Sequence, residues 1–388
     1  MKKTIAILGS TGSIGKTLIN ILKKDKNNFT ILLLTSNENI KEIIKQTNFF
    51  NVKNLIVTNK KKFLIIKKLL KNKKINIFNN FDSIDDIFKG KNIDYTMNAI
   101  SSIYGLEPTL KIIKYSKKIA IANKESIICG WSLIQKELKN HKSFFLPIDS
   151  EHFSIYSLIN KTTNENIEKI FITASGGPFV NYAISKFQSI TPQEALKHPN
   201  WNMGKKISID SATMMNKVFE IIEAKKIFNL KYTKLEMLIH TQSYIHAIVK
   251  FSNGITKVLI HDTNMTIPIF NSLYPKFDKK IKSNKLDLSI LNNLNLKKVD
   301  YKKFPVTKII NNLPNIDSLF ETVIVSANDA LVNLFLNKKI KFNDISKVLL
   351  KIINLSEFNK YKRIKPKNVG EIIKLMNYVS LKINTMSI

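Results

Sequence analysis

The stretch that decides the fold is the opening MKKTIAILGSTGSIGKTLINIL, residues 1–22. Its apolar run from Thr4 to Leu8 predicts a buried strand, and the apolar residues after the glycines recur at helical spacing. The GSTGSIG motif, residues 9–15, therefore lies on the turn between a strand and a helix. Glycines there permit a tight turn and let backbone N–H groups approach a pyrophosphate at the helix N-terminus.

Three glycines can also mark an ordinary turn. The spacing here, G-x-x-G-x-x-G, differs from the G-x-G-x-x-G that is typical of dinucleotide sites. The context favours the nucleotide interpretation, because a second predicted strand, Phe29 to Leu34, follows the helix at the distance of a βαβ unit. The end of that strand is where the ribose of a dinucleotide is bound in such folds.

Length and composition indicate a globular protein of two or three domains, with 388 residues and a hydrophobic fraction of 44%. No apolar run approaches the ~18 residues that span a bilayer. The chain starts on a core strand with no targeting segment ahead of it, so we expect a cytoplasmic location. The one cysteine, Cys129, lies in the apolar stretch SIICGWSLI and is expected to pack rather than to react.

The net charge of +33 would ordinarily suggest a nucleic-acid-binding protein, because lysines neutralise phosphates and release counterions. Here the lysines are scattered along the whole chain among many Asn and Ile, and base recognition favours arginine, which is scarce. We interpret the excess as a compositional bias of an A+T-rich genome that still attracts phosphorylated ligands. A basic nucleic-acid-binding protein on a nucleotide-binding scaffold is the alternative.

The pattern of strands and helices predicts an α/β fold. Up to about residue 150, apolar strands alternate with amphipathic helices, which indicates a Rossmann-like doubly wound parallel sheet. From about 150 to 275 a helix, several strands and a long helix indicate an α+β domain whose later strands pair antiparallel. Residues 276–305 lack a period and are predicted to be a linker, and 306–388 carry the helical periodicity of a C-terminal bundle.

Two acids lie directly after a predicted strand in FFLPIDSEHFSIY, residues 144–156. In extended backbone Asp149 and Glu151 face the same way, and carboxyl ends of parallel strands hold ligands in α/β enzymes, so the pair could bind Mg²⁺ or Mn²⁺. Alternatively, Asp149 or Ser150 caps the following helix, with Glu151 in its first turn. This stretch alone favours the cap.

A second polar segment is KISIDSATMMNKVFEIIEAKK, residues 206–226. Asp210 or Ser211 is predicted to cap a long helix in which Asn216, Glu220 and Glu223 lie on one face. That face could simply be solvated, or Glu220 could be a third metal carboxylate. The residues that could then bind a phosphate through hydroxyl, amide and ammonium groups are Ser211, Asn216 and Lys217.

Two glycine-containing loops lie between these segments. Ser175 and the two glycines after it follow the predicted strand KIFIT and could form a second phosphate cradle. The loop HPNWNMG, residues 198–204, is a candidate lid that excludes water, or else Trp201 and Met203 pack against the edge of a core. His240, His246 and His261 lie in strand-like stretches and are assigned to structure.

Taken in order, GSTGSIG, ANKES, PIDSEH, SGGPF, HPNWNMG and DSATMMNK closely resemble the motifs of the 1-deoxy-D-xylulose 5-phosphate reductoisomerase family. The resemblance runs from the first strand to the C-terminal helices. It implies a dimeric oxidoreductase of the non-mevalonate isoprenoid pathway. With NADPH and Mg²⁺ or Mn²⁺, such an enzyme rearranges 1-deoxy-D-xylulose 5-phosphate and reduces the product to 2-C-methyl-D-erythritol 4-phosphate.

The same resemblance implies the domains and the site residues. Residues 1–149 would bind NADPH, 150–275 would form the catalytic and dimerisation domain with its flexible lid, and 276–305 would link it to the helical domain 306–388. The implied metal ligands are Asp149, Glu151 and Glu220. Implied substrate contacts are Lys124, Ser150 and His198, with Ser175, Ser211, Asn216 and Lys217 on the phosphate and Trp201 and Met203 in the lid. Implied nucleotide contacts are Gly9, Thr11, Gly12, Ser13, Ile14, Gly15, Asn37, Asn39, Asn123, Glu125 and Gly204.

One departure from the family pattern concerns the loop after the second strand, in LLLTSNENIKE, residues 32–42. The family usually has a small residue followed by a basic one there, whereas this chain has Ser36, Asn37 and Glu38. An acid at this place accepts hydrogen bonds from the ribose hydroxyls of NAD and repels the 2′-phosphate of NADPH. We expect NADPH to be preferred by a narrower margin, with Lys41 or the overall positive field compensating.

Overall fold

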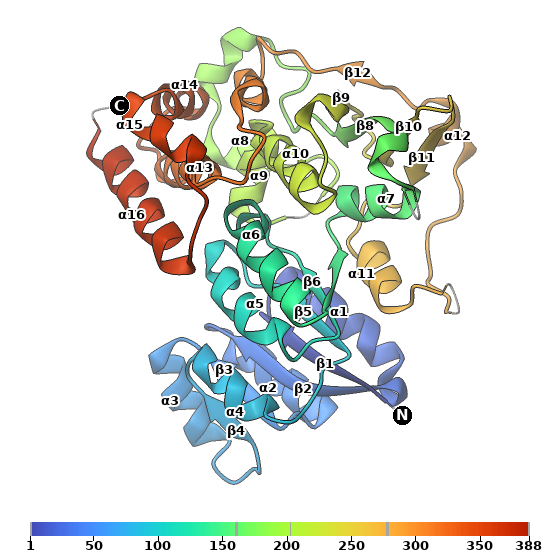
Figure 1. Cartoon of the computed structure of the whole chain (residues 1–388), viewed down its shortest axis with the longest axis vertical. Coiled ribbons are helices and arrows are strands. Elements are labelled where there is room, and N and C mark those ends of the chain that lie inside the picture. Colours follow the sequence, from blue (N-terminus) through green and yellow to red (C-terminus); the bar gives the residue numbers. More distant parts are fainter. Residues whose placement is uncertain (1, 160–161, 202, 277–278, 387–388) are drawn as a thin grey trace. The chain divides into compact units, whose positions relative to one another are not determined.

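The computed structural model describes residues 2–159, 162–201, 203–276 and 279–386. It divides into two compact units, whose elements are labelled in Figure 1. The first unit comprises residues 1–127, 133–149 and 265–281, and the second comprises 128–132, 150–264 and 282–388. Among the described residues, no helix combines the length and the apolar character that crossing a membrane requires.

The first unit is built on a parallel sheet of seven strands in the order β4-β3-β2-β1-β5-β6-β7. The strands are β1 (Lys3–Leu8), β2 (Phe29–Ser36), β3 (Asn54–Val57), β4 (Asn76–Phe78), β5 (Tyr95–Asn98), β6 (Lys118–Ile121) and β7 (Phe144–Pro147). The strand order reverses between β1 and β5, which is where α/β sheets of this kind bind ligands. The predicted doubly wound parallel sheet is confirmed.

Helices connect these strands and bury their apolar faces against the sheet. They are α1 (Ser13–Lys24), α2 (Ile40–Phe50), α3 (Lys60–Leu69), α4 (Ile84–Phe88), α5 (Leu106–Ile113) and α6 (Lys124–Asn140), of which residues 128–132 are grouped with the second unit. A later helix, α11 (Thr266–Leu273), also belongs to the first unit. The Ser272 hydroxyl on α11 lies 2.8 Å from the buried Tyr95 hydroxyl, and Tyr274 donates to Asp25 at 2.7 Å.

The second unit contains a mixed sheet in the order β11-β10-β8-β9-β12. Its strands are β8 (Ile167–Ala174), β9 (Leu235–Ile239), β10 (Ile245–Phe251), β11 (Thr256–Ile260) and β12 (Lys297–Lys298). Strand β10 pairs antiparallel with both β8 and β11, which confirms the predicted pairing of the later strands. Inside the segment predicted to be a linker, β12 pairs with β9 and a short helix, α12 (Leu288–Asn292), forms.

The helices of the second unit carry six of the candidate site residues: Ser150, Glu151, Ser211, Asn216, Lys217 and Glu220. These helices are α7 (Ser150–Leu158), α8 (Pro192–Ala195), α9 (Lys205–Ala212), α10 (Met215–Ile227), α13 (Phe320–Leu336), α14 (Phe342–Ile353), α15 (Ser356–Asn359) and α16 (Val369–Thr385). The single long helix predicted to start at Asp210 or Ser211 is wrong. Both residues lie in α9, and Met214, with a left-handed φ of 68°, separates α9 from α10.

A tertiary contact explains why Asp210 does not act as a helix cap. Its carboxylate is 2% exposed and accepts from Asn328 Nδ2 at 2.7 Å and from Lys206 Nζ at 3.0 Å. Lys206 also pairs with Asp329 at 3.0 Å. The carboxylate therefore joins α9 to α13, a contact between residues more than a hundred positions apart that local helix signals do not reveal.

The glycines of the opening motif have different physical roles. Gly9 adopts φ 77°, and its N–H donates to Thr35 Oγ1 at 2.7 Å. A Cβ on Gly15 would lie 2.4 Å from the Gly9 carbonyl oxygen, so α1 approaches the turn after β1 as closely as a residue without a side chain allows. A Cβ on Gly12 would make only ordinary contacts, the nearest at 3.6 Å. Gly15 is therefore required for packing, whereas Gly12 leaves the start of α1 open.

We expect Gly15→Ala to lower the free energy of unfolding by about 1–3 kcal/mol, the usual cost of forcing an extra carbon into a packed contact. Gly12→Ala, made as the matched control, should change it by less than ~0.5 kcal/mol, the usual range for a site with room. Urea denaturation of both variants measures the difference. Equal stabilities would show that the contact between α1 and the turn after β1 does not need a glycine at position 15.

Candidate active site

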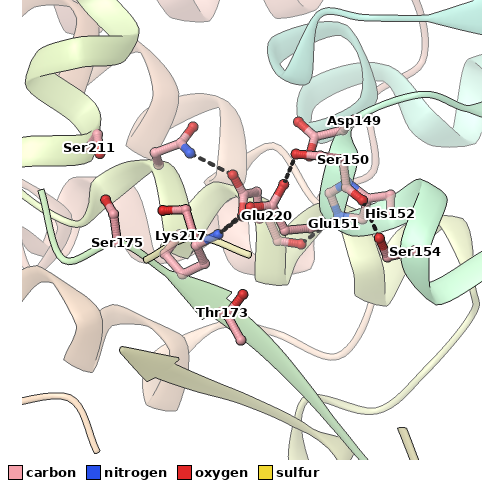
Figure 2. A network of polar contacts seen from close by, with 12 residues as sticks. Asp149, Ser150, Glu151, His152, Ser154, Thr173, Ser175, Ser211, Lys217 and Glu220 are labelled. Atoms are coloured by element: carbon pink, nitrogen blue, oxygen red, sulfur yellow. Dashed lines mark hydrogen bonds and ion pairs between the residues drawn. The ribbon is translucent and has the colours of Figure 1, made fainter. Parts of the chain in front are cut away.

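Three carboxylates converge where α7 begins. Asp149 lies between the end of β7 and α7, Glu151 lies in the first turn of α7, and Glu220 comes from the middle of α10. One oxygen of each carboxylate lies within 4.8 Å of the others. The extended backbone expected for Asp149 and Glu151 is wrong for Glu151, which is helical, so the turn into α7 brings these carboxylates together instead (Figure 2).

Buried partners neutralise part of this negative charge. The Lys217 ammonium donates to Glu151 Oε1 at 3.0 Å and to Glu220. Burial lowers the pKa of Lys217, but the two carboxylates outweigh burial and hold that pKa above its usual range. Asn216 Nδ2 donates to Glu220 Oε1 at 2.5 Å, and the Ser150 hydroxyl donates to Glu151 Oε2 at 2.6 Å. Because Lys217 and Glu220 are 4% and 1% exposed, the polar face of α10 is not a solvated face.

The start of α6 holds a further cation beside Asp149. Lys124, the first residue of α6, is buried and forms an ion pair with the Asp149 carboxylate. Asn123 caps the helix, since its Oδ1 accepts from Ser126 N at 3.1 Å while its Nδ2 donates to the Ile100 carbonyl at 2.8 Å. The ANKES motif thus fixes Lys124 against Asp149 through a capped helix start.

Sequence reasoning missed His152, which lies next to Glu151 in the quoted PIDSEH motif. Its Nε2 donates to the backbone carbonyl of Glu220 at 2.9 Å, and its Nδ1 lies 4.0 Å from a carboxylate oxygen of Glu223. Asp149, His152 and Glu223 form a second group whose ligand atoms lie within 4.8 Å of one another. The only sequence signal for His152 was that it directly follows Glu151. Its role depends on the contact with the Glu220 carbonyl on α10.

Two serines and a histidine form a second polar cluster, and Figure 2 shows Ser175 and Ser211 on the same side of Glu220. His198 Nε2 lies 3.1 Å from each of the two hydroxyls. Its Nδ1 accepts the backbone N–H of Asn200 at 3.1 Å and of Trp201 at 3.0 Å. Nδ1 is therefore unprotonated and Nε2 carries the hydrogen. Burial lowers the pKa of His198 to about 4, which keeps the ring neutral.

Glycines bring the loop after β8 close to α9. Gly177 has φ 68°, its N–H donates to Ser175 Oγ at 3.0 Å, and a Cβ on it would lie 2.8 Å from the Ser211 carbonyl oxygen. The SGGPF motif therefore brings a serine hydroxyl beside the hydroxyl of Ser211. Hydroxyls and a neutral N–H donor arranged in this way suit the oxygens of an anion.

The loop proposed as a lid is held at one end. Asn200 Nδ2 donates to the Thr241 carbonyl at 2.7 Å and to Ser243 Oγ at 2.8 Å, and the Trp201 ring meets His246 edge-on with centroids 6.4 Å apart. Trp201 and Met203 are half-buried, and residue 202 between them lies outside the described residues. Gly204 is exposed and precedes α9 as its N-cap.

Comparison with known proteins gives a consistent result over the whole chain. Three family models match in order: 1-deoxy-D-xylulose 5-phosphate reductoisomerase over residues 5–130, its C-terminal domain over 145–228, and the DXP reductoisomerase C-terminal domain over 261–379. A 1-deoxy-D-xylulose 5-phosphate reductoisomerase of Pelagibacter ubique (strain HTCC1062) is 65% identical over 387 residues, covering 100% of both chains. The chain belongs to the 1-deoxy-D-xylulose 5-phosphate reductoisomerase family.

More distant relatives agree. The reductoisomerase of Clostridium novyi (strain NT) is 36% identical over 391 residues, 98% of this chain and 100% of that one. The solved structure of the Zymomonas mobilis enzyme in complex with NADPH matches with a TM-score of 0.89 and 30% identity over 100% of both chains. A reductoisomerase structure with NADPH, fosmidomycin and magnesium matches with a TM-score of 0.86 and 29% identity over 98% of this chain and 96% of that one.

Family membership decides between the two functions predicted from the sequence. The chain is an oxidoreductase of the non-mevalonate isoprenoid pathway that acts on 1-deoxy-D-xylulose 5-phosphate. The alternative drawn from the net charge, a basic nucleic-acid-binding protein, is therefore rejected. Cys129 is buried, as expected for a residue that packs.

In this reductoisomerase the nucleotide candidates of the first unit lie along the carboxyl edge of the sheet. Gly12 is the N-cap of α1 and offers no side chain to its first turn, in which Ser13 is exposed and Ile14 half-buried. The Thr11 hydroxyl lies 2.9 Å from that of Ser36 at the end of β2. Two more candidates accept hydrogen bonds. Asn37 Oδ1 accepts from the Thr58 hydroxyl, and Asn39 Oδ1 caps α2 by accepting from Glu42 N at 3.1 Å. Glu125 is buried in the first turn of α6.

We expect the His198 ring to titrate near pH 4 in the folded reductoisomerase, against about 6.5 for an ordinary histidine. The folded state therefore loses stability as the pH falls from about 6.5 to 4, because the unfolded chain binds this proton first. NMR of the ring Cε1–H, assigned with His198→Asn, measures the value, and the urea-unfolded chain is the control. A midpoint near 6.5 in the folded protein would contradict the burial that lowers this pKa.

Proposed function

We propose that Asp149, Glu151 and Glu220 hold the divalent metal of the reductoisomerase reaction. The observation that supports this most strongly is the convergence of their three carboxylates within 4.8 Å. Carboxylate oxygens are the ligands that Mg²⁺ and Mn²⁺ prefer, so the donor set fits such an ion. When bound, the ion would supply Lewis-acid polarisation of the substrate ketone and the neighbouring hydroxyl oxygen. A magnesium-bound reductoisomerase among the structural relatives supports the assignment.

The position of the Lys217 ammonium depends on whether a metal ion is bound to these carboxylates. Its ammonium contacts Glu151 and Glu220, so it competes with a dication for the same oxygens. A cation between these carboxylates would repel the ammonium and turn it toward an incoming anion. We therefore assign Lys217 to the substrate phosphate, and Lys124 and Ser150, which contact Asp149 and Glu151, to the hydroxyl-bearing carbons.

The second polar cluster binds the phosphate in this proposal. Ser175, Ser211 and Asn216 supply hydroxyl and amide donors, and the neutral His198 keeps the two hydroxyls 3.1 Å from its Nε2. A neutral ring suits this position, because Nδ1 can then accept from the backbone N–H groups of Asn200 and Trp201 while Nε2–H points at the hydroxyls. Binding energy from a phosphate remote from the reacting carbons orients the substrate. Trp201 and Met203 would exclude water above it.

NADPH is the reductant that we assign to the first unit. The residues fit a dinucleotide: Gly12 leaves the first turn of α1 open to a pyrophosphate, and a carboxyl-edge loop follows β2 where a ribose binds. The full set we propose is Gly9, Thr11, Gly12, Ser13, Ile14, Gly15, Asn37, Asn39, Asn123, Glu125 and Gly204. NADPH in two of the related structures supports it. When bound, NADPH would supply the hydride that reduces the rearranged aldehyde, and these residues would hold and orient it.

Glu220→Gln tests the metal assignment. We expect the affinity for Mn²⁺ to fall at least ~100-fold, the upper end of what losing even an outer partner costs, and turnover to fall with it. NADPH binding should be unchanged. Electron paramagnetic resonance of Mn²⁺ measures the affinity, and calorimetry measures NADPH binding.

The matched control is Glu236→Gln, which removes a carboxylate from a partly exposed pair with Lys169, 3.4 Å apart. It should leave the affinity for Mn²⁺ and turnover within twofold of the unmodified protein. Thermal unfolding checks that each variant folds. Normal Mn²⁺ affinity in a folded Glu220→Gln protein would remove Glu220 from the metal site.

We also propose that the enzyme is a homodimer that pairs through one edge of the second sheet. Strand β11 is that edge. Val258 on this strand is 44% exposed, and Ile255, directly before it, is 52% exposed. Exposed apolar edge strands are places where sheets extend into a second chain. The cytoplasmic location expected from the sequence stays a prediction.

Light scattering after size exclusion should give twice the chain mass of 44.5 kDa. Val258→Asp should shift the protein toward the single-chain mass, since it places a charge in the shared edge. Leu64→Asp, at an exposed leucine of the first unit, is the control and should leave the mass unchanged. A single-chain mass for the unmodified protein would contradict the dimer, and an unchanged dimer of Val258→Asp would exclude this edge.

A further inference from the structure

The loop after β2 lacks the positive charge that NADPH requires. NADPH differs from NADH by a 2′-phosphate, and such a monoester carries about −1.5 to −2 charges at pH 7. The loop offers Asn37 and then Glu38, both exposed. A carboxylate at the end of the second strand favours free ribose hydroxyls and repels the phosphate. If NADPH is the reductant, as proposed above, the compensating charge comes from another segment.

The start of α3 lies beside this loop. Strands β2 and β3 pair in parallel with Ser36 opposite Val57, so their two loops leave the same edge of the sheet. The Thr58 N–H donates to the Ser36 carbonyl at 3.1 Å, and the Thr58 hydroxyl donates to Asn37 Oδ1 at 3.0 Å. The second bond orients the Asn37 amide, because it fixes Oδ1 toward Thr58 and directs the Nδ2 donors away from it.

Lysines follow Thr58 and Asn59 in the sequence. Asn59 caps α3, with its Oδ1 accepting from Lys62 N at 3.1 Å, and Lys60 and Lys61 are the exposed first residues of the helix. From Ile43 to Phe81 the chain holds ten lysines and no aspartate or glutamate. No carboxylate within that segment therefore neutralises the ammonium groups next to the loop.

Lys41, the other nearby cation, has different surroundings. It lies three residues after Glu38 and directly before Glu42 in the first turn of α2. Two carboxylates flank one ammonium there, so the local charge is negative. The acid-free start of α3 is the stronger site for an anion.

We propose that Lys60 and Lys61 bind the 2′-phosphate of NADPH together with the Asn37 amide. The loop after β3 then supplies the charge that the loop after β2 lacks, and these lysines set the preference for NADPH over NADH. Glu38 limits that preference, because it favours a ribose with free hydroxyls.

The double variant Lys60→Ala with Lys61→Ala tests this in binding experiments that need no turnover. Calorimetry on the full-length, metal-free protein should show the Kd for NADPH rising at least ~10-fold, the effect of losing one charged contact, while the Kd for NADH stays within twofold. Adenosine 2′,5′-bisphosphate should weaken like NADPH, and adenosine 5′-monophosphate should not change. Thermal unfolding verifies the fold.

Lys67→Ala with Lys68→Ala is the matched control, because it removes the same charge from the exposed end of the same helix. It should leave the ratio of the two Kd values within twofold. Adding Glu38→Lys to the Lys60 and Lys61 double variant should restore tight NADPH binding. The proposal is overturned if Lys60→Ala with Lys61→Ala leaves the ratio of the NADPH and NADH Kd values unchanged. It is also overturned if Lys41→Ala, and not that double variant, abolishes the preference for NADPH.

The outcomes also separate this inference from the cofactor assignment. If the unmodified protein binds neither NADPH nor adenosine 2′,5′-bisphosphate, the NADPH site proposed for the first unit fails, and the lysine proposal fails with it. If the unmodified protein binds both and the Lys60 and Lys61 variant binds them equally well, only the lysine proposal fails.

Discussion

The second unit depends on holding like charges together out of water. Two carboxylates whose oxygens lie within 4.8 Å of each other repel by at least about 3 kcal/mol at an effective dielectric constant near 20. The fold offsets this repulsion with Lys217, which contacts Glu151 and Glu220, and with amide and hydroxyl donors from Asn216 and Ser150. Because these donors sit on the same two helices as the carboxylates, α7 and α10 must pack in one fixed arrangement. The acidic site and the packing of the unit are therefore one constraint.

The first unit was predictable because its signals are local. Alternating apolar strands, helical spacing and glycines at the first turn all act within a few residues, and they gave the parallel sheet correctly. Convergence of Asp149, Glu151 and Glu220 was implied by resemblance, whereas spacing left it open. Extended backbone is the wrong geometry for Glu151, because the chain is already helical at Ser150, three residues after the end of β7. A local pattern does not reveal a turn that brings distant carboxylates together.

Other features could not be predicted because tertiary contacts create them. The carboxylate of Asp210 bonds Asn328 rather than capping a helix, and a left-handed Met214 interrupts the expected long helix. The role of His152 depends on a carbonyl of α10. Burial keeps the His198 ring neutral, and two backbone N–H groups fix its tautomer. In each case the sequence names the residue type correctly, and a partner elsewhere in the chain decides its chemistry.

The interruption at Met214 has a mechanical consequence. An unbroken helix is stiff along its axis, so a displacement of Ser211 would be transmitted directly to Glu220, nine positions later. A left-handed residue costs about 1–3 kcal/mol and ends the regular hydrogen-bonding of the first segment. Two short helices, α9 and α10, therefore replace one long helix. Ser211 on α9 can therefore shift without displacing Glu220 on α10, although both lie in the one polar segment 206–226.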